Sequence, residues 1–128
     1  AALVAATADR LADGGVIVGA AGNDSGLFMG ILARYLAQTA LALRDTTAAH
    51  LVHASARAAW DNRAEVGGLP LFGADWTRPV TAPTGPESSL QIADPPLASS
   101  PNQSRDLSVQ LSGWMLLEAD YQLTSAGH

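Results

Sequence analysis

The strongest helical pattern of this sequence is LFMGILARYLAQTALAL, residues 27–43. Its large side chains share one face and its small ones the other, and a helix that is apolar all round is a buried one. We therefore expect both faces to pack. Asp24 or Ser25 can cap its first amides, and Asp45-Thr46-Thr47, one residue beyond its end, can cap another helix. So short a link predicts an antiparallel helical hairpin.

Outside this hairpin, helical spacing predicts a helix over residues 1–12, stopped by Gly14 and Gly15, and a last helix from about Ser104 to Leu123. Residues 64–102 show no helical periodicity and are rich in Pro and Gly, so they are predicted to form a long loop. We expect its apolar part, 69–76, to pack on the helices. The β-branched run 15–19 has no obvious partner, so no strand pair is predicted. The fold class is all-α.

Composition narrows the range of functions. The chain has 128 residues, 12 acidic and 7 basic side chains, no lysine and no cysteine. This length predicts one domain. The seven dispersed arginines make nucleic acid a poor partner. Disulfides and thiolate metal sites are excluded, no cofactor motif is present, and no apolar run is long enough for a transmembrane segment.

Four side chains stand out as candidates for binding or packing. Asp24 lies in a glycine-bounded loop before a buried helix, where it either caps the helix or binds a sugar. Trp76 follows Gly73 in the long loop and either stacks on a sugar ring or anchors the loop. Trp60 and Trp114 fall on helical stripes, so we expect them in the core.

The charged and titratable residues of the helices favour structural roles. His50 and His53 lie one turn apart, but no third ligand completes a metal site, so we expect surface or core histidines. Arg34, beside Tyr35 in the helix expected to be buried, needs a partner if it is inside, because an unpaired buried charge is costly.

The order of several segments resembles glycoside hydrolase family 76, the endo-α-1,6-mannanases. Residues 24–36, DSGLFMGILARYL, look like the family stretch F-K-G-I-F-x-R-Y-L, with Met29 where lysine is common. Further matches follow in the family's order: residues 54–63 (ASARAAWDNR), 72–76 (FGADW) and 107–111 (LSVQL).

This resemblance implies that residues 1–128 are the C-terminal portion of a glycoside hydrolase domain, with helical hairpins forming part of an incomplete (α/α)6 toroid. The inner helices of that toroid surround an open cleft. In that family two adjacent aspartates act as nucleophile and general acid/base with retention of configuration, whereas this sequence contains no Asp-Asp. The chain is therefore expected to form cleft wall without catalytic residues or metal, and to be inactive alone.

Within that reading, Asp24, Phe28 and Trp76 are expected nearest a polysaccharide substrate resembling α-1,6-mannan, with Arg34 and Tyr35 structural. The family points to an extracellular or cell-envelope location. The alternative is a noncatalytic helical module for protein interaction or carbohydrate binding. Both hypotheses predict a homo-oligomer that forms through the exposed inner-helix face, because large exposed apolar patches are typical of protein interaction sites.

Overall fold

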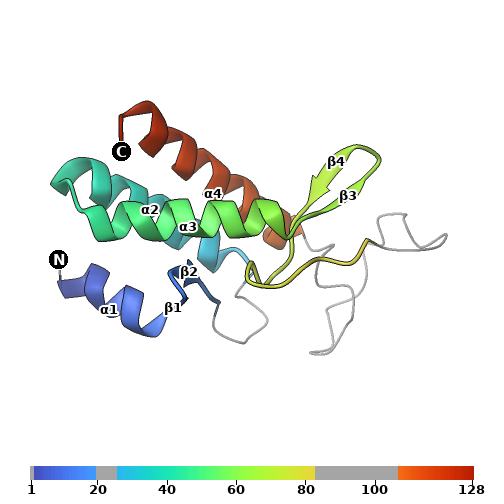
Figure 1. Cartoon of the computed structure of the whole chain (residues 1–128), viewed down its shortest axis with the longest axis horizontal. Helices are drawn as coiled ribbons and strands as arrows, with labels where there is room; N and C mark the ends of the chain where they lie inside the picture. The colour runs from blue at the N-terminus through green and yellow to red at the C-terminus, as the bar shows by residue number, and fades with distance from the viewer. Residues whose placement is uncertain (1, 20–25, 83–106) are drawn as a thin grey trace.

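The structure is a computed structural model that describes residues 2–19, 26–82 and 107–128. The elements in chain order are α1 (Ala2–Arg10), β1 (Ala12–Asp13), β2 (Val16–Ile17), α2 (Phe28–Leu43), α3 (Thr46–Asp61), β3 (Ala64–Val66), β4 (Leu69–Leu71) and α4 (Leu107–Ser125). Figure 1 shows α2, α3 and α4 packed side by side, α1 next to α3, and the β3–β4 hairpin at one end of the helices. The described chain is thus mostly helical, which confirms the predicted fold class.

The predicted α2–α3 hairpin is present. Arg44 ends α2 in the left-handed conformation, with φ 54°, and turns the chain. Asp45 caps α3, because its Oδ1 accepts a hydrogen bond from the Ala48 N–H at 2.9 Å. One residue that reverses the chain and one that caps the next helix are sufficient to make the two helices antiparallel.

Gly30 of α2 and Ser112 of α4 lie at a close approach of the two helices. The Ser112 hydroxyl accepts from the Gly30 N–H at 2.9 Å and donates to the Gly26 carbonyl at 2.6 Å. A Cβ on Gly30 would lie 2.6 Å from the Ser112 Cα, which no real Cβ contact allows. Gly30 is therefore required by packing rather than by a turn.

This contact rotates α2 so that its small face is buried and its large face is buried only in part, which corrects the expectation that both pack. The small face, with Ala33, Ala37 and Ala40, lies in the core, and Leu36 of the large face is buried with it. The rest of the large face points outward, and Phe28 and Tyr35 are 47% and 61% exposed. Alanines allow the helix axes to approach, so the small face forms the better interface with α3 and α4.

Two short antiparallel hairpins were not predicted. β1 pairs with β2 and β3 with β4, and the second hairpin lies inside the segment expected to be a loop. Each turn is a Gly-Gly pair, Gly14-Gly15 and Gly67-Gly68, with positive φ at both residues. Two-residue hairpin turns of this kind require positive φ, which glycine adopts without strain. The two Gly-Gly pairs are thus a signal for hairpin turns that the sequence contains, whereas we predict above that Gly14 and Gly15 end a helix.

The apolar start of the long loop packs on α4, as expected. The Gln110 side chain accepts from the Phe72 N–H at 2.9 Å and donates to the Phe72 carbonyl at 2.8 Å. The buried Phe72 ring lies against Gly113, where a Cβ would come within 2.4 Å of it. Of the predicted 64–102 loop, residues 83–102 lie outside the described residues.

Among the helices that the structure describes, none combines the length and the hydropathy that a bilayer crossing requires.

Replacing Gly30 by alanine tests the α2–α4 contact. Helix propensity alone would stabilise Gly30→Ala by about 1 kcal/mol. Overpacking against the Ser112 backbone costs about 1–3 kcal/mol, so we expect a net loss of up to about 2 kcal/mol. Urea unfolding measures the difference. Arg34→Ala, on the exposed side of α2, is the control and should stay within about 0.5 kcal/mol of the wild type. A stabilised Gly30→Ala protein would contradict the contact.

Candidate functional site

The residues predicted to contact a sugar do not form one cluster among the described residues. Phe28 lies in the first turn of α2 and is largely solvent-facing, as a ligand contact requires. Trp76 is 2% exposed and belongs to the core. Asp24 lies outside the described residues. Phe28 is therefore the described member of the predicted set that is free to touch a ligand.

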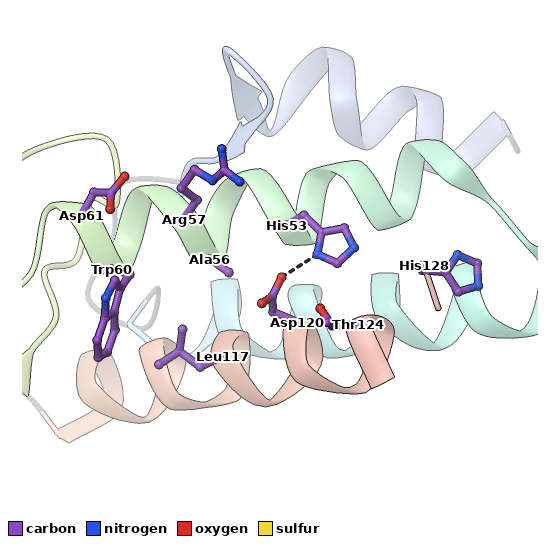
Figure 2. A pocket seen from close by; sticks show the side chains of 9 residues that line it. All are labelled: His53, Ala56, Arg57, Trp60, Asp61, Leu117, Asp120, Thr124 and His128. Carbon is purple, nitrogen blue, oxygen red and sulfur yellow. Dashed lines mark hydrogen bonds and ion pairs between the residues drawn. The ribbon is translucent and has the colours of Figure 1, made fainter. Parts of the chain in front are cut away.

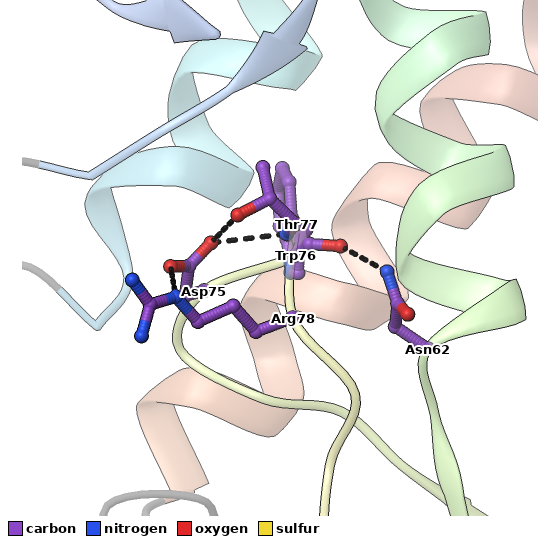
Figure 3. Close-up of polar contacts among 5 residues, drawn as sticks. All are labelled: Asn62, Asp75, Trp76, Thr77 and Arg78. Carbon is purple, nitrogen blue, oxygen red and sulfur yellow. Dashed lines mark hydrogen bonds and ion pairs between the residues drawn. The ribbon is translucent and has the colours of Figure 1, made fainter.

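Trp76 anchors its loop, and the sugar-stacking alternative is wrong. Its carbonyl accepts from Asn62 Nδ2 at 2.9 Å, at the end of α3 (Figure 3). The carbonyl of Asn62 in turn accepts from the Val80 N–H at 2.8 Å. Asn62 thus holds the loop at two points, Trp76 and Val80. The indole of Trp76 is buried, and removing a ring of that size from water stabilises the packing of the loop.

Asp75 has a local structural role next to that tryptophan. Its Oδ1 accepts from the Thr77 N–H at 3.0 Å and from the Thr77 hydroxyl at 2.6 Å, while Oδ2 lies 3.4 Å from Arg78 Nε. Figure 3 shows these contacts closing a tight turn. A carboxylate that accepts from the backbone two residues ahead stabilises such a turn, so Asp75 is accounted for by the fold.

Arg34 and Tyr35 are both exposed on α2. The expectation of a buried, paired Arg34 is wrong, because the Gly30–Ser112 contact turns this part of the helix toward solvent. The structural role predicted for Tyr35 does not come from core packing, since its ring is on the surface.

A largely open hollow of the described surface lies between α3 and α4, and we call it the α3–α4 groove. It has a volume of about 630 Å³. Figure 2 shows the residues that line it: His53, Ala56, Arg57, Trp60, Asp61, Leu117, Asp120, Thr124 and His128. None of them comes from α2. The groove was not foreseen, because its two sides are more than fifty residues apart in the sequence.

Trp60 is 42% exposed in this groove, which corrects its assignment to the core. The Arg63 guanidinium lies over its ring, 3.8 Å from the centroid. Arg63 also donates to the Trp60 carbonyl at 2.7 Å and to Glu65 Oε1 at 3.0 Å. The indole is therefore held from one side by a cation while part of its surface stays in water. Trp114 is likewise exposed, with its ring edge-to-face against Phe72.

His53 and Asp120 form the central polar pair of the groove. His53 Nδ1 and Asp120 Oδ1 are 2.6 Å apart and join α3 to α4 (Figure 2). A carboxylate that orients an imidazole is the arrangement of a general base. Here, however, His53 Nε2 is buried and has no hydrogen-bond partner among the described residues. Because that nitrogen is not accessible from solvent, the pair connects the helices and offers no free imidazole nitrogen to a substrate.

The groove does not bring a pair of carboxylates together for glycoside hydrolysis. His53 and Asp61 are eight residues apart on α3, about 12 Å along the helix axis. Asp120 is bound at His53 in the middle of the groove, whereas Asp61 lies at one end of it (Figure 2). Glycosidase carboxylates are about 5–9.5 Å apart.

The two histidines of α3 face different neighbours. His50 borders Gly15 of the β1–β2 turn, whereas His53 points to α4. Residues 2–19, 26–82 and 107–128 contain no group of three His, Asp or Glu side chains placed to hold a metal ion.

Two solved structures are similar to this chain over most of its length. The Lin0763 protein from Listeria innocua is 25% identical and matches 98% of this chain and 30% of its own, with a TM-score of 0.67. The GH76A α-1,6-mannanase from Salegentibacter sp. HEL1_6 is 28% identical and matches 89% of this chain and 28% of its own, with a TM-score of 0.60. The chain thus spans less than a third of either protein.

No protein-family model matches the sequence, and no curated protein does. The fold is therefore established by the structural likeness: the helices are arranged as in part of an α/α-toroid glycoside hydrolase.

A double-mutant cycle on His53 and Asp120 measures how strongly the pair couples α3 to α4. The two side chains are each about a third exposed. Charge-assisted hydrogen bonds contribute about 1.5–3 kcal/mol when buried, so with solvent screening we expect about 1 kcal/mol of coupling in urea unfolding of His53→Ala, Asp120→Ala and the double variant.

The matched control is the ion pair between Arg63 and Glu65, whose carboxylate is largely exposed. Its cycle should give less than about 0.5 kcal/mol. Equal coupling energies in the two cycles would show that the His53–Asp120 bond does not fix the helix pair.

Proposed function

We propose that this chain is part of a carbohydrate-cleaving hydrolase that acts on an α-1,6-mannan-like polysaccharide. In this proposal residues 1–128 are the C-terminal portion of an (α/α)6 domain and form a wall of its cleft without supplying the catalytic aspartates. The observation that carries the proposal is the structural similarity to an α-1,6-mannanase over 89% of the chain.

The outward face of α2 supports a cleft-wall role. Phe28, Ile31 and Tyr35 are exposed on one side of the helix, at spacings of three and four residues. Aromatic rings present flat apolar faces, and Tyr35 adds a hydroxyl that can hydrogen-bond. Such a row suits the C–H faces and hydroxyl groups of a sugar chain, with Phe28 in the first turn of the helix.

The second candidate function is a noncatalytic helical module, for interaction or carbohydrate binding. The same exposed row favours it, because a continuous apolar face also suits self-association. Both functions predict self-association through this face, so they differ in sugar binding: the cleft wall binds α-1,6-mannan through Phe28, whereas a module for protein interaction alone binds a second copy and no sugar. Sedimentation at several protein concentrations, with Tyr35→Ser as the variant, measures the self-association.

Binding of α-1,6-mannan to the chain tests the proposal. We expect affinity gels to show retarded migration, and Phe28→Ala to weaken binding about tenfold because a ring-to-sugar contact is lost. Leu3→Ala, which removes an even more exposed apolar side chain from α1, is the control and should bind as the wild type. The far-ultraviolet circular dichroism of each variant checks its fold.

The same samples are assayed for reducing ends released from the mannan. We expect none from the 128-residue chain, because it contains no Asp-Asp. Release by this chain would contradict the noncatalytic wall, and failure of the wild type to bind would contradict the cleft.

A further inference from the structure

The α3–α4 groove is a second surface with the features of a ligand site, separate from the face of α2 used above. Its residues come from α3, from α4 and from His128. Its volume of about 630 Å³ lies within the ~300–1,000 Å³ of small-molecule sites. An aromatic side chain, an apolar floor and several polar groups meet in it (Figure 2).

The floor and one end of the groove are apolar. Ala56 is buried and Leu117 half-buried between the helices, and the Trp60 ring lies beside them. Arg63 stacks on Trp60 and bonds to its carbonyl, so the indole is fixed before any ligand arrives. A ring that is already oriented loses little entropy when a flat apolar face is placed on it.

The rim of the groove has hydrogen-bonding capacity that the fold does not use. Arg57 and Asp61 are exposed one turn apart on α3, and neither makes an ion pair or side-chain hydrogen bond with a described residue. Across the groove, Asp120 uses Oδ1 for His53, and the Thr124 hydroxyl lies close by. A guanidinium donates up to five hydrogen bonds and carboxylates accept them. The vicinal hydroxyl groups of a sugar both donate and accept hydrogen bonds, so they match this combination of donors and acceptors.

The groove presents charged groups of both signs. Arg57, Asp61 and Asp120 line it, whereas Arg63 lies over the Trp60 ring and is paired with Glu65. A phosphate would meet two carboxylates, and a cation would meet the Arg57 guanidinium, so neither is favoured. A neutral ligand with an apolar face and hydroxyl edges fits the floor and the rim together.

We propose that the α3–α4 groove binds neutral sugar units of a polysaccharide, with Trp60 as the stacking platform and Arg57 and Asp61 as hydrogen-bonding groups. The groove would bind the polysaccharide at a place separate from the α2 face and would have no catalytic role. The choice of α-1,6-linked mannose as the sugar rests on the proposed function; the groove chemistry itself points to any neutral hexose.

Calorimetric titration of the whole chain with α-1,6-mannotriose tests the groove. We expect Trp60→Ala and Arg57→Ala each to weaken binding about tenfold and Trp60→Phe to retain most of it, because phenylalanine keeps a stacking face. Arg57 makes no ion pair or side-chain hydrogen bond with the residues that the structure describes, so Arg57→Ala keeps the test valid if Trp60→Ala unfolds. Arg34→Ala, which removes an exposed arginine outside the groove, is the matched control.

The outcomes separate the two proposals. Loss of binding in Trp60→Ala and Arg57→Ala, with Phe28→Ala unchanged, supports the groove and overturns the α2 face as the binding surface. Loss in Phe28→Ala alone overturns the groove and supports the cleft wall. A wild type that binds neither mannotriose nor gluco- and galacto-oligosaccharides overturns both, whereas binding of another hexose through Trp60 supports the groove and overturns the mannan assignment. Self-association without sugar that Trp60→Ala abolishes identifies a second copy as the occupant and overturns the groove proposal.

Discussion

The contact between the Gly30 backbone and Ser112 is the constraint on which the rest of the structure depends. A side chain at position 30 cannot be accommodated, since its Cβ would meet the Ser112 Cα at 2.6 Å. The hydroxyl group also satisfies the Gly30 N–H and the Gly26 carbonyl, near the start of α2, where backbone groups lack intrahelical partners. The distance, the rotation and the beginning of α2 are therefore all set at one point.

α4 organises the other elements in the same way, through single polar side chains. Ser112 holds α2, Gln110 pairs with both backbone groups of Phe72, and Asp120 holds His53 of α3. Apolar packing favours association of these helices but leaves their rotation weakly specified. Hydrogen bonds are directional, so three such side chains along one helix define how each neighbour is turned.

The rotation of α2 has a functional consequence. Because the alanine-rich face is buried, Phe28 and Tyr35 are placed in solvent, where a ligand can reach them. Between α3 and α4 a hollow remains beside Trp60, lined by no residue of α2. Two surfaces with exposed aromatic rings follow from one packing arrangement, and both suit a sugar chain better than a charged ligand.

The sequence by itself determined the helices, their order and the α2–α3 hairpin, because spacing, caps and short links are local properties. It also held the signal for the two Gly-Gly hairpins. Which face of α2 is buried, whether Trp60 and Trp76 lie on the surface or in the core, and the meeting of His53 with Asp120 were decided by tertiary structure. The physical reason is that these three features depend on contacts between residues far apart in the chain. Helical periodicity identifies the apolar faces of a helix, but the close approach of another backbone decides which of two such faces is buried.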